Sequence, residues 1–318
     1  MVLIILVTGC AGFIGFNLCQ RLLNEGHEVL GVDKITNEYD IAIKQHRVAG
    51  LIKNINFHFL EWDISSLEKE QMKDIDVVFH QAAYANVRNS IENPMLFDEE
   101  NTTKTVGLLK LAADSNVSRF VFASSAAIYG NADVPIKETA PLNPISPYGV
   151  SKLAAEKYCD AFFECYGLST ISLRYFTAYG PWGRPDMLIL MSIASCLEGA
   201  PMINIFKNAA GEIVPYTRDF SYVDDIVEAN MLAMKTSRKN LAVNIGAGKE
   251  VSVQDVIKLI ENETGKSAMK EDALASPTDP IRSLCDITLA KSELGFEPKT
   301  NVEEGIRKTI EWYKQYKG

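Results

Sequence analysis

The sequence has 318 residues, of which 47% are hydrophobic and 23% charged, a composition typical of a globular protein with one large domain or two coupled ones. Its formal net charge of −9 disfavours nucleic acid and anionic membrane surfaces as partners, because like charges repel. Six cysteines without a C-x-x-C pair and four histidines without H-x-x-x-H spacing predict buried thiols, a cytoplasmic protein and no metal site.

Short β-branched segments alternate with amphipathic segments through the first half of the chain. The expected strands cover residues 3–7, 27–32, 55–60, 76–80, 119–123 and 169–173. Two of the expected helices cover residues 15–26 and 101–115. This alternation predicts an α/β fold of the Rossmann type, a doubly wound parallel sheet with helices on both faces. The apolar opening is short, lacks a basic flank and is expected to be a buried strand.

The pattern changes after about residue 180, where the turn-rich segment GPWGRPDM begins. Mostly helical sequence follows, with short extended segments at 202–206 and 242–246 and an irregular hairpin or loop at 207–217. We therefore expect an NAD-binding domain at 1–180 and a smaller mixed α/β substrate domain at 181–318, with the chain crossing back between them.

The end of the chain, residues 301–318, predicts an amphipathic helix. Ile306, Ile310 and Tyr313 recur at helical spacing on one face of this segment.

A glycine-rich turn follows the first expected strand and opens the first expected helix. The segment VTGCAGFIG places Gly9, Gly12 and Gly15 in the order G-x-x-G-x-x-G. Such glycines allow a tight turn and the close approach of a pyrophosphate to the helix N-terminus. The alternative is a turn that binds nothing, but Asp33 ends the next strand, where a carboxylate can hold adenosine ribose hydroxyls. The sequence thus predicts NAD rather than NADP, although Lys34 beside Asp33 weakens that preference slightly.

Other cofactor contacts are expected in the same loop and after the third strand, where an adenine ring could rest. They are Phe13, Ile14, Asp63 and Ile64.

Three side chains suited to alcohol oxidation follow the fifth strand. Ser125 comes just after that strand, and Tyr148 and Lys152 lie four residues apart in an expected helix. Alone, the Tyr–Lys spacing is weak, because it only places both side chains on one helix face. Next to a dinucleotide at the carboxyl edge of a parallel sheet, however, all three converge on one crevice. We expect Lys152 and the oxidised nicotinamide to lower the tyrosine pKa, so that Tyr148 can accept a hydroxyl proton.

Seven motifs in a fixed order carry a resemblance over nearly the whole chain: TGCAGFIG, HQAAYANVRNSIENP, SSAAIYG, SPYGVSK, LRYFTAYGPWGRPDM, RDFSYVDDI and LCDITLAKSELGF. The sequence resembles the extended short-chain dehydrogenase/reductases, especially the UDP-glucose 4-epimerase-like nucleotide-sugar epimerases. The resemblance implies an isomerase that oxidises sugar C4 to a transient 4-keto form, lets it turn, and reduces its other face with tightly bound NAD. Ser125 and Tyr148 would be catalytic, and Lys152 would support Tyr148 and the nicotinamide ribose.

The same resemblance implies further contacts and a homodimer. Arg218 matches a diphosphate-binding arginine, and Ile205 and Phe206 lie where the uracil is usually held. Helices beginning near Pro94 and Tyr148 would pair with their copies in the partner. The remaining expected cofactor contacts are Ala82, Ala83, Asn101 and Tyr175, and the remaining expected substrate contacts are Arg88, Ala126 and Arg282.

Two alternatives to epimerisation concern the residues after Ser125. Related dehydratases and uronate decarboxylases carry carboxylates there, whereas this chain has Ala126 and Ala127, which cannot move protons. A carboxylate from elsewhere in the fold could still serve such a reaction. A non-catalytic nucleotide sensor is disfavoured by the intact Tyr148–Lys152 pair.

The sequence favours two classes of UDP-sugar. Thr177 and Arg184 resemble residues that face the carboxylate in UDP-glucuronate 4-epimerases, and an arginine fork suits a carboxylate. Arg184 could equally be a loop arginine or a diphosphate contact. Ser283 is a small residue at a position that gates the sugar pocket, so UDP-N-acetylglucosamine or its galacto epimer should fit. An N-acetylated sugar acid would satisfy both features.

Overall fold

The computed structural model describes residues 2–276 and 278–318, and the side chains of these residues other than 203–205. Its centre is a seven-stranded sheet in the order β10-β6-β5-β4-β1-β2-β3, in which all neighbouring strands are parallel. The fold class expected from the sequence is therefore confirmed. The strands are β1 (Ile4–Thr8), β2 (Glu28–Val32), β3 (Phe57–Leu60), β4 (Val77–His80), β5 (Arg119–Ser125), β6 (Thr170–Tyr175) and β10 (Asn240–Ile245).

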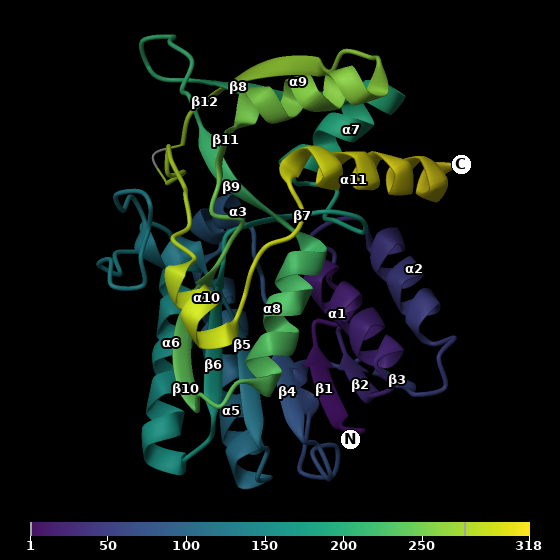
Figure 1. The fold of residues 1–318 in the computed structure, drawn as a ribbon, viewed down its shortest axis with the longest axis vertical. Helices are drawn as coiled ribbons and strands as arrows, with labels where there is room; N and C mark the ends of the chain where they lie inside the picture. The colour runs from purple at the N-terminus through teal and green to yellow at the C-terminus, as the bar shows by residue number, and fades with distance from the viewer. Residues whose placement is uncertain (1, 277) are drawn as a thin grey trace.

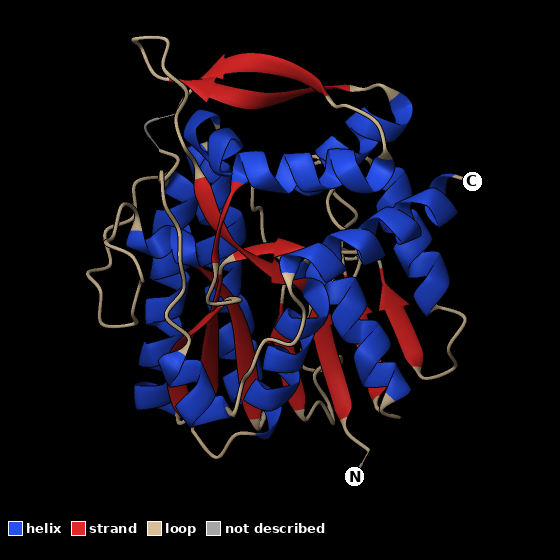
Figure 2. Cartoon of the chain, turned by 45° about the horizontal axis from the view of Figure 1, so that its top comes forward, coloured by secondary structure: helices blue, strands red, loops and turns tan. Residues whose placement is uncertain are grey.

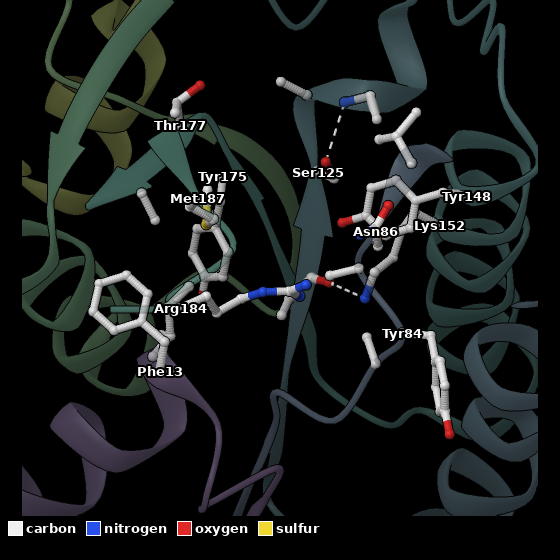
Figure 3. A pocket seen from close by; sticks show the side chains of 18 of the residues that line it. Phe13, Tyr84, Asn86, Ser125, Tyr148, Lys152, Tyr175, Thr177, Arg184 and Met187 are labelled. Atoms are coloured by element: carbon white, nitrogen blue, oxygen red, sulfur yellow. Dashed lines mark hydrogen bonds between the residues drawn. The ribbon is translucent and has the colours of Figure 1, made fainter. Parts of the chain in front are cut away.

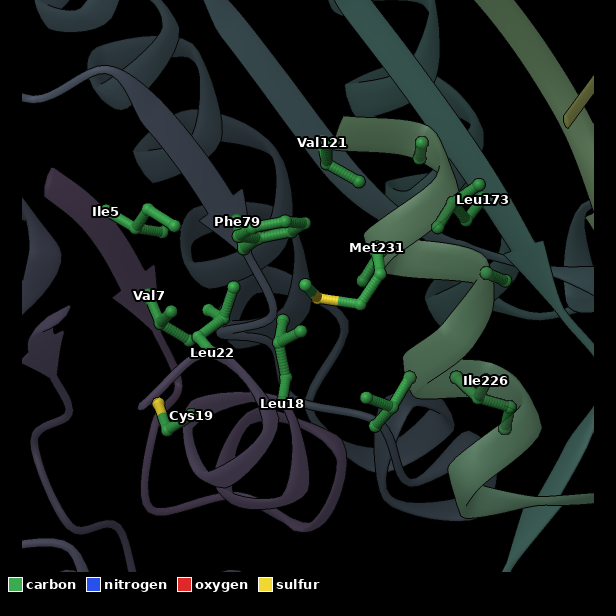
Figure 4. Close-up of a cluster of buried hydrophobic side chains, with 14 of the residues drawn as sticks. Ile5, Val7, Leu18, Cys19, Leu22, Phe79, Val121, Leu173, Ile226 and Met231 are labelled. Carbon is green, nitrogen blue, oxygen red and sulfur yellow. The ribbon is translucent and has the colours of Figure 1, made fainter. Parts of the chain in front are cut away.

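Helices cover both faces of this sheet (Figure 1). On one face, α1 (Phe13–Asn24) and α8 (Val223–Lys235) share a core with the strands. Figure 4 shows Leu18 and Leu22 of α1 meeting Met231 of α8 over Phe79 of β4. On the other face lie α5 (Lys104–Asp114) and α6 (Pro147–Tyr166). Burial on both faces explains why the strands are almost continuously apolar.

Further helical segments lie between the strands of the central sheet. They are α2 (Ile41–Leu51), the 3-10 helix η1 (Ile64–Ser66), α3 (Val87–Glu92), α4 (Pro94–Asp98), the π-helical turn η2 (Glu99–Thr103) and the 3-10 helix η3 (Ala126–Tyr129).

A second lobe sits over the carboxyl ends of the central strands (Figure 2). One of its sheets has the order β11-β9-β7, and the other pairs β8 with β12. Its strands are β7 (Thr177–Tyr179), β8 (Pro201–Lys207), β9 (Thr217–Tyr222), β11 (Glu250–Ser252) and β12 (Met269–Leu274). Its helices, α7 (Leu188–Glu198), α9 (Val253–Thr264) and α11 (Val302–Lys317), share a third core.

The chain returns to the central sheet after building part of the second lobe. β10 pairs with β6, and α10 (Thr288–Leu294) packs into the same core as α8. The division of the chain at residue 180 stays a proposal, since elements on both sides of it contribute to the sheet.

The expected C-terminal amphipathic helix is confirmed by α11, whose residues Ile306, Ile310 and Tyr313 are all buried. The expectation of buried thiols is wrong for Cys165, which lies exposed near the end of α6, while the other five cysteines are buried. None of the helices described is both long enough and apolar enough to cross a bilayer.

Candidate active site

One cavity of about 760 Å³ lies between the carboxyl ends of the central strands and the second lobe. It brings together almost all the residues predicted to bind cofactor or substrate. Those that line it are Gly9, Gly12, Phe13, Ile14, Gly15, Asp33, Lys34, Asp63, Ile64, Ala82, Ala83, Arg88, Ser125, Ala126, Tyr148, Lys152, Tyr175, Thr177, Arg184, Phe206, Arg218, Arg282 and Ser283.

Two predicted residues are not placed on the cavity wall. Asn101 is buried behind it, where its amide donates to the Tyr84 carbonyl (2.9 Å) and accepts from the Tyr84 N–H (2.8 Å). Since Tyr84 itself lines the cavity, Asn101 supports the wall from outside. The side chain of Ile205 lies outside the described residues.

The glycine loop brings backbone against backbone. A Cβ on Gly9, whose φ is +70°, would lie 2.6 Å from the Ala82 nitrogen, and one on Gly15 would lie 2.1 Å from the Gly9 carbonyl oxygen. Larger residues would therefore push the loop apart. The loop opens α1 at Phe13, and the first N–H groups of a helix attract phosphate. This cradle fits a dinucleotide pyrophosphate.

Asp33 follows β2 and lies deep in the cofactor end of the cavity. Its carboxylate accepts hydrogen bonds from the Ala11 N–H (3.1 Å) and the Ile35 N–H (2.8 Å). Burial raises its pKa, whereas these hydrogen bonds and nearby Lys44 lower it. Its position suits ribose hydroxyls.

Lys34, which could in principle hold a 2′-phosphate, is engaged in a square of four charges. Its Nζ bonds to Asp63 (3.0 Å) and Glu100 (2.6 Å), and Lys104 bonds to the same two carboxylates (2.6 and 2.7 Å). The carboxylates therefore compensate the charge that would attract a phosphate. Together with Asp33, this arrangement fits NAD.

Ser125 and Tyr148 face the same region of the cavity (Figure 3). Ser125 ends β5, and Tyr148 lies in the first turn of α6, which Ser146 caps by accepting the Gly149 N–H (3.1 Å). Gly149 permits close packing, because a Cβ there would lie 2.6 Å from the Ala127 carbonyl oxygen. Burial raises the pKa of Tyr148, while hydrogen bonding to Ser125 and the charge of Arg184 lower it.

Lys152 makes a different contact from the one expected. Its Nζ donates to the Ala123 carbonyl (2.8 Å) and lies 5.0 Å from the centroid of the Phe122 ring. Burial lowers its pKa to about 7. The groups that lower the Tyr148 pKa here are Ser125 and Arg184, and the expectation that Lys152 and the oxidised nicotinamide lower it together stays a prediction. A buried ammonium needs a hydrogen-bond acceptor, and the Ala123 carbonyl supplies one.

Thr177 and Arg184 bring a hydroxyl and a cation to the opposite wall. Thr177 begins β7, and the largely buried Arg184 side chain reaches into the pocket beside Tyr175 and Met187 (Figure 3). Arg184 Nε and Nη2 donate to Asp186 at 3.1 and 2.8 Å. This edge of the guanidinium is thereby neutralised.

Arginines and aromatic rings gather at the outer end of the cavity. Arg218 donates to the Thr217 carbonyl (2.8 Å), and its Cζ lies 5.1 Å from the centroid of the Tyr216 ring. Arg88 lies 5.3 Å from the Phe206 ring centroid, and its Nη2 is 3.3 Å from an Asp279 oxygen. Cations combined with ring faces suit a nucleoside diphosphate.

The Arg282 guanidinium is already paired with a carboxylate, which its position in the sequence did not indicate. Its Nε and Nη2 donate to Glu250 at 2.8 and 2.7 Å, which neutralises this rim cation. Ser283 lies beside it on the cavity wall.

Several cavity-lining residues on loops were not predicted from the sequence. Glu38 and Tyr39 come from the segment after β2, Tyr84 from the segment after β4, and Tyr216 from the segment before β9. Tyr84 had a signal, because it lies in the motif HQAAYANVRNSIENP directly after Ala83, and Glu38 and Tyr39 lie close to the motif residue Asp33. No fixed spacing marks Tyr216.

Comparisons with known proteins agree with this geometry. Residues 5–246 match the model of the NAD dependent epimerase/dehydratase family. A UDP-glucuronate 4-epimerase from Thermodesulfobacterium geofontis is 37% identical over 98% of this chain and 96% of its own length.

Solved structures are similar over the whole chain. The UDP-glucuronic acid 4-epimerase from Bacillus cereus, in complex with UDP-glucuronic acid and NAD, has a TM-score of 0.93 at 33% identity and covers 99% of this chain and 100% of its own. A UDP-N-acetylglucosamine 4-epimerase from Methanobrevibacter ruminantium M1, in complex with UDP-N-acetylmuramic acid, has a TM-score of 0.89 at 27% identity, with 99% of both chains covered.

These relatives confirm the family, the isomerase class and the NAD dependence expected from the sequence. The motifs, the sheet and the cofactor cradle all lead to the same conclusion: the chain belongs to the NAD-dependent epimerase/dehydratase family.

Proposed function

We propose that this protein is a UDP-glucuronate 4-epimerase, which interconverts UDP-glucuronate and UDP-galacturonate. The observation that carries the proposal is Arg184, a largely buried cation in the same cavity as Ser125 and Tyr148. Asp186 engages its Nε and Nη2, and the described part of the chain gives its Nη1 no hydrogen-bond partner. A sugar carboxylate is a suitable partner for that free edge. The similarity to known UDP-glucuronate 4-epimerases supports this substrate.

Ser125 and Tyr148 would carry the proton chemistry at the sugar C4 hydroxyl. Tyr148 accepts the hydroxyl proton as C4 is oxidised and returns it after the keto sugar has turned. Ser125 lowers the pKa of Tyr148 by hydrogen bonding to it before the sugar binds, and its single O–H would then donate to the reacting oxygen. The chemistry that NAD supplies when bound is reversible acceptance of a hydride.

Lys152 would hold the cofactor end of this site. Its Nζ, which donates to the Ala123 carbonyl, would also donate to the nicotinamide ribose.

Elimination and decarboxylation are disfavoured by the side chains that follow Ser125. Ala126 and Ala127 line the cavity and can neither donate nor accept a proton. Asp186, a carboxylate on the opposite wall, is paired with Arg184. The keto intermediate therefore has no free acid or base at these positions, which favours its reduction back to the alcohol. A carboxylate left to serve another reaction is Glu38, which lines the same cavity near Tyr148 and Arg184.

An N-acetylated UDP-sugar is a second candidate substrate. Ser283 lines the cavity and is small enough to leave room for a 2-N-acetyl group. A substrate with both an acetamido group and a carboxylate would use Ser283 and Arg184 together.

We also propose that the enzyme is a homodimer. Apolar side chains are exposed on α3, α4 and α6, among them Ile91 (48%), Met95 (79%) and Val150 (53%). Light scattering should give twice the chain mass, and a monomer would contradict the proposal.

The substrate can be tested by incubating the purified enzyme with UDP-glucuronate, UDP-glucose or UDP-N-acetylglucosamine and resolving each 4-epimer by chromatography. We expect the highest kcat/KM for UDP-glucuronate. In Arg184→Ala this kcat/KM should fall at least tenfold, because the substrate carboxylate is left without its cation. The control Arg238→Ala removes an exposed arginine paired with Glu293. Exclusive turnover of the N-acetyl sugar would instead make Ser283 the informative residue.

A further inference from the structure

Arg47 is a fully buried arginine that the proposed chemistry does not use. It lies on α2 with an exposed fraction of 0%. Its Nη2 donates to the carbonyl oxygens of Trp182 (2.5 Å) and Gly183 (3.0 Å), the two residues before Arg184. Its Nη1 donates to the Tyr39 hydroxyl (2.8 Å) and to the carbonyl oxygen of Ala11 in the glycine loop (2.8 Å). One buried cation thus connects the backbone that precedes Arg184 with the side chain of Tyr39.

Tyr39 in turn lies against Arg184. The Arg184 Cζ is 5.1 Å from the centroid of the Tyr39 ring, within the range of a cation–π contact. Both residues line the cavity, although Tyr39 comes from the loop after β2 and Arg184 from the segment after β7. The ring gives the guanidinium a surface on which to lie, while Asp186 fixes one of its edges.

The backbone before Arg184 is held in an unusual conformation. Trp182 has φ +61°, a left-handed value that is rare for a bulky residue. Its ring packs against Phe16 (5.1 Å between centroids), Trp312 (5.3 Å) and Tyr316 (5.5 Å). Such a conformation persists only where surrounding contacts enforce it. The rings and Arg47 provide those contacts.

We propose that Tyr39 and Arg47 are positioning residues that hold Arg184 with its free Nη1 edge toward the substrate carboxylate. Arg47 fixes the Trp182–Gly183 turn, and Tyr39 fixes the plane of the guanidinium. An arginine held in advance loses less conformational freedom on binding, which increases affinity for the ligand that it recognises. The inference rests on the proposed function, because it assigns the carboxylate to Arg184.

The inference can be separated from simple packing, since a positioning residue acts only through Arg184. The test uses the NAD-bound enzyme in a Tyr148→Phe background, which prevents the ligand from being converted. Calorimetry would give the Kd of UDP-glucuronate and of UDP-glucose for the parent, Tyr39→Leu, Arg184→Ala and the double variant. Tyr166→Leu is a matched control, because it removes an exposed ring that lies 5.5 Å from Lys110, on α5 and α6 outside the cavity.

We expect Tyr39→Leu to weaken the binding of UDP-glucuronate about tenfold and that of UDP-glucose less than twofold. The reason is that Arg184 loses a partly desolvated cation–π contact and is no longer held in place before the ligand binds. In the Arg184→Ala background, Tyr39→Leu should have no further effect, since contacting residues that act together are not additive. Arg47→Lys should also lower the preference for UDP-glucuronate, because a lysine cannot reach both the turn and Tyr39 in one planar fork. A circular dichroism spectrum would confirm that these variants are folded.

Two results would overturn the inference in distinguishable ways. If Arg184→Ala leaves the preference for UDP-glucuronate unchanged, the carboxylate assignment fails, and the positioning role fails with it. If Arg184→Ala abolishes that preference but Tyr39→Leu weakens both ligands equally, or weakens UDP-glucuronate equally in both backgrounds, the carboxylate assignment stands and the positioning role is wrong.

Discussion

Glu156 and Arg174 form a fully buried ion pair behind the strand that carries Ser125, with 2.5 Å between Oε1 and Nη2. Glu156 also accepts a hydrogen bond from the Ser124 hydroxyl (2.7 Å), and Arg174 donates to the Tyr129 hydroxyl (2.6 Å). The pair thus connects α6, β5 and β6 immediately behind the proposed catalytic residues. A buried pair of this kind fixes relative positions even where its net contribution to stability is small.

Removing one partner of this pair should be costly. Arg174→Met leaves the Glu156 carboxylate buried without its cation, so we expect the free energy of unfolding to fall by about 3–5 kcal/mol. Lys157→Met, which breaks the exposed pair with Asp160 on the same helix, should change it by less than about 1 kcal/mol. Urea unfolding of both variants measures the difference, and equal effects would show that burial of the pair is unimportant.

The glycine loop should not tolerate a methyl group. In Gly15→Ala, the new Cβ would lie 2.1 Å from the Gly9 carbonyl oxygen, so the loop must open. We expect a loss of about 1–3 kcal/mol in stability, typical of overpacking, together with loss of bound NAD. Gly107→Ala is the matched control, since its Cβ meets nothing within 4 Å on α5 and should stabilise the helix by about 0.5–1 kcal/mol. Retention of NAD by Gly15→Ala, measured by absorbance after denaturation, would contradict the cradle.

Local sequence predicted the glycine loop and the Ser125–Tyr148–Lys152 set, because these depend on short motifs and on the carboxyl edge of a parallel sheet. Contacts between distant segments could not be predicted. Strand β10 was expected only as a short extended segment, and its pairing with β6 requires the chain to return from the second lobe. Likewise, the position of Lys152 was predicted but its bond to the Ala123 carbonyl was not.

The support for Arg184 illustrates the same limit. Arg47 and Trp182 are 135 residues apart in sequence, and no motif of fixed spacing contains both of them. A buried arginine in an amphipathic helix gives no sequence signal of the carbonyl groups that it will bind. Such contacts follow from the packing of α2 against the turn before α7.

His80 should make stability depend on pH. It is buried between the Thr8 hydroxyl (2.7 Å) and the Thr105 hydroxyl (2.8 Å), and burial followed by the charge of Lys152 lowers its pKa to about 3. Between roughly pH 6.5 and 3 the unfolded chain binds a proton that the folded protein does not, so stability falls as the pH falls.

The measurement is the free energy of unfolding of wild type minus that of His80→Gln, from pH 8 to pH 4. This difference should be constant above about pH 7 and should then decrease by up to about 1.4 kcal/mol per pH unit. A difference that stays constant over the whole range would show that folding does not shift the pKa of His80.

Tyr148 should be required for turnover and not for cofactor binding. Tyr148→Phe keeps the ring, which lies 6.3 Å from the Phe97 ring, and removes only the hydroxyl. We expect kcat to fall by about 10²–10⁴-fold, the range for loss of a general acid–base group, with NAD content unchanged. Tyr158→Phe, an exposed position on the same helix, is the control. Epimerisation at an undiminished rate in Tyr148→Phe would exclude Tyr148 as the proton acceptor.

The central claim is that C4 of a UDP-uronate is oxidised and reduced again within one cavity. The most direct test is to incubate the enzyme with UDP-glucuronate carrying deuterium at C4 and to analyse the products by mass spectrometry. The account predicts UDP-galacturonate that retains its deuterium, with no release of carbon dioxide, because the same hydride returns to the sugar. Deuterium lost to solvent, a decarboxylated pentose product, or unchanged substrate would contradict it.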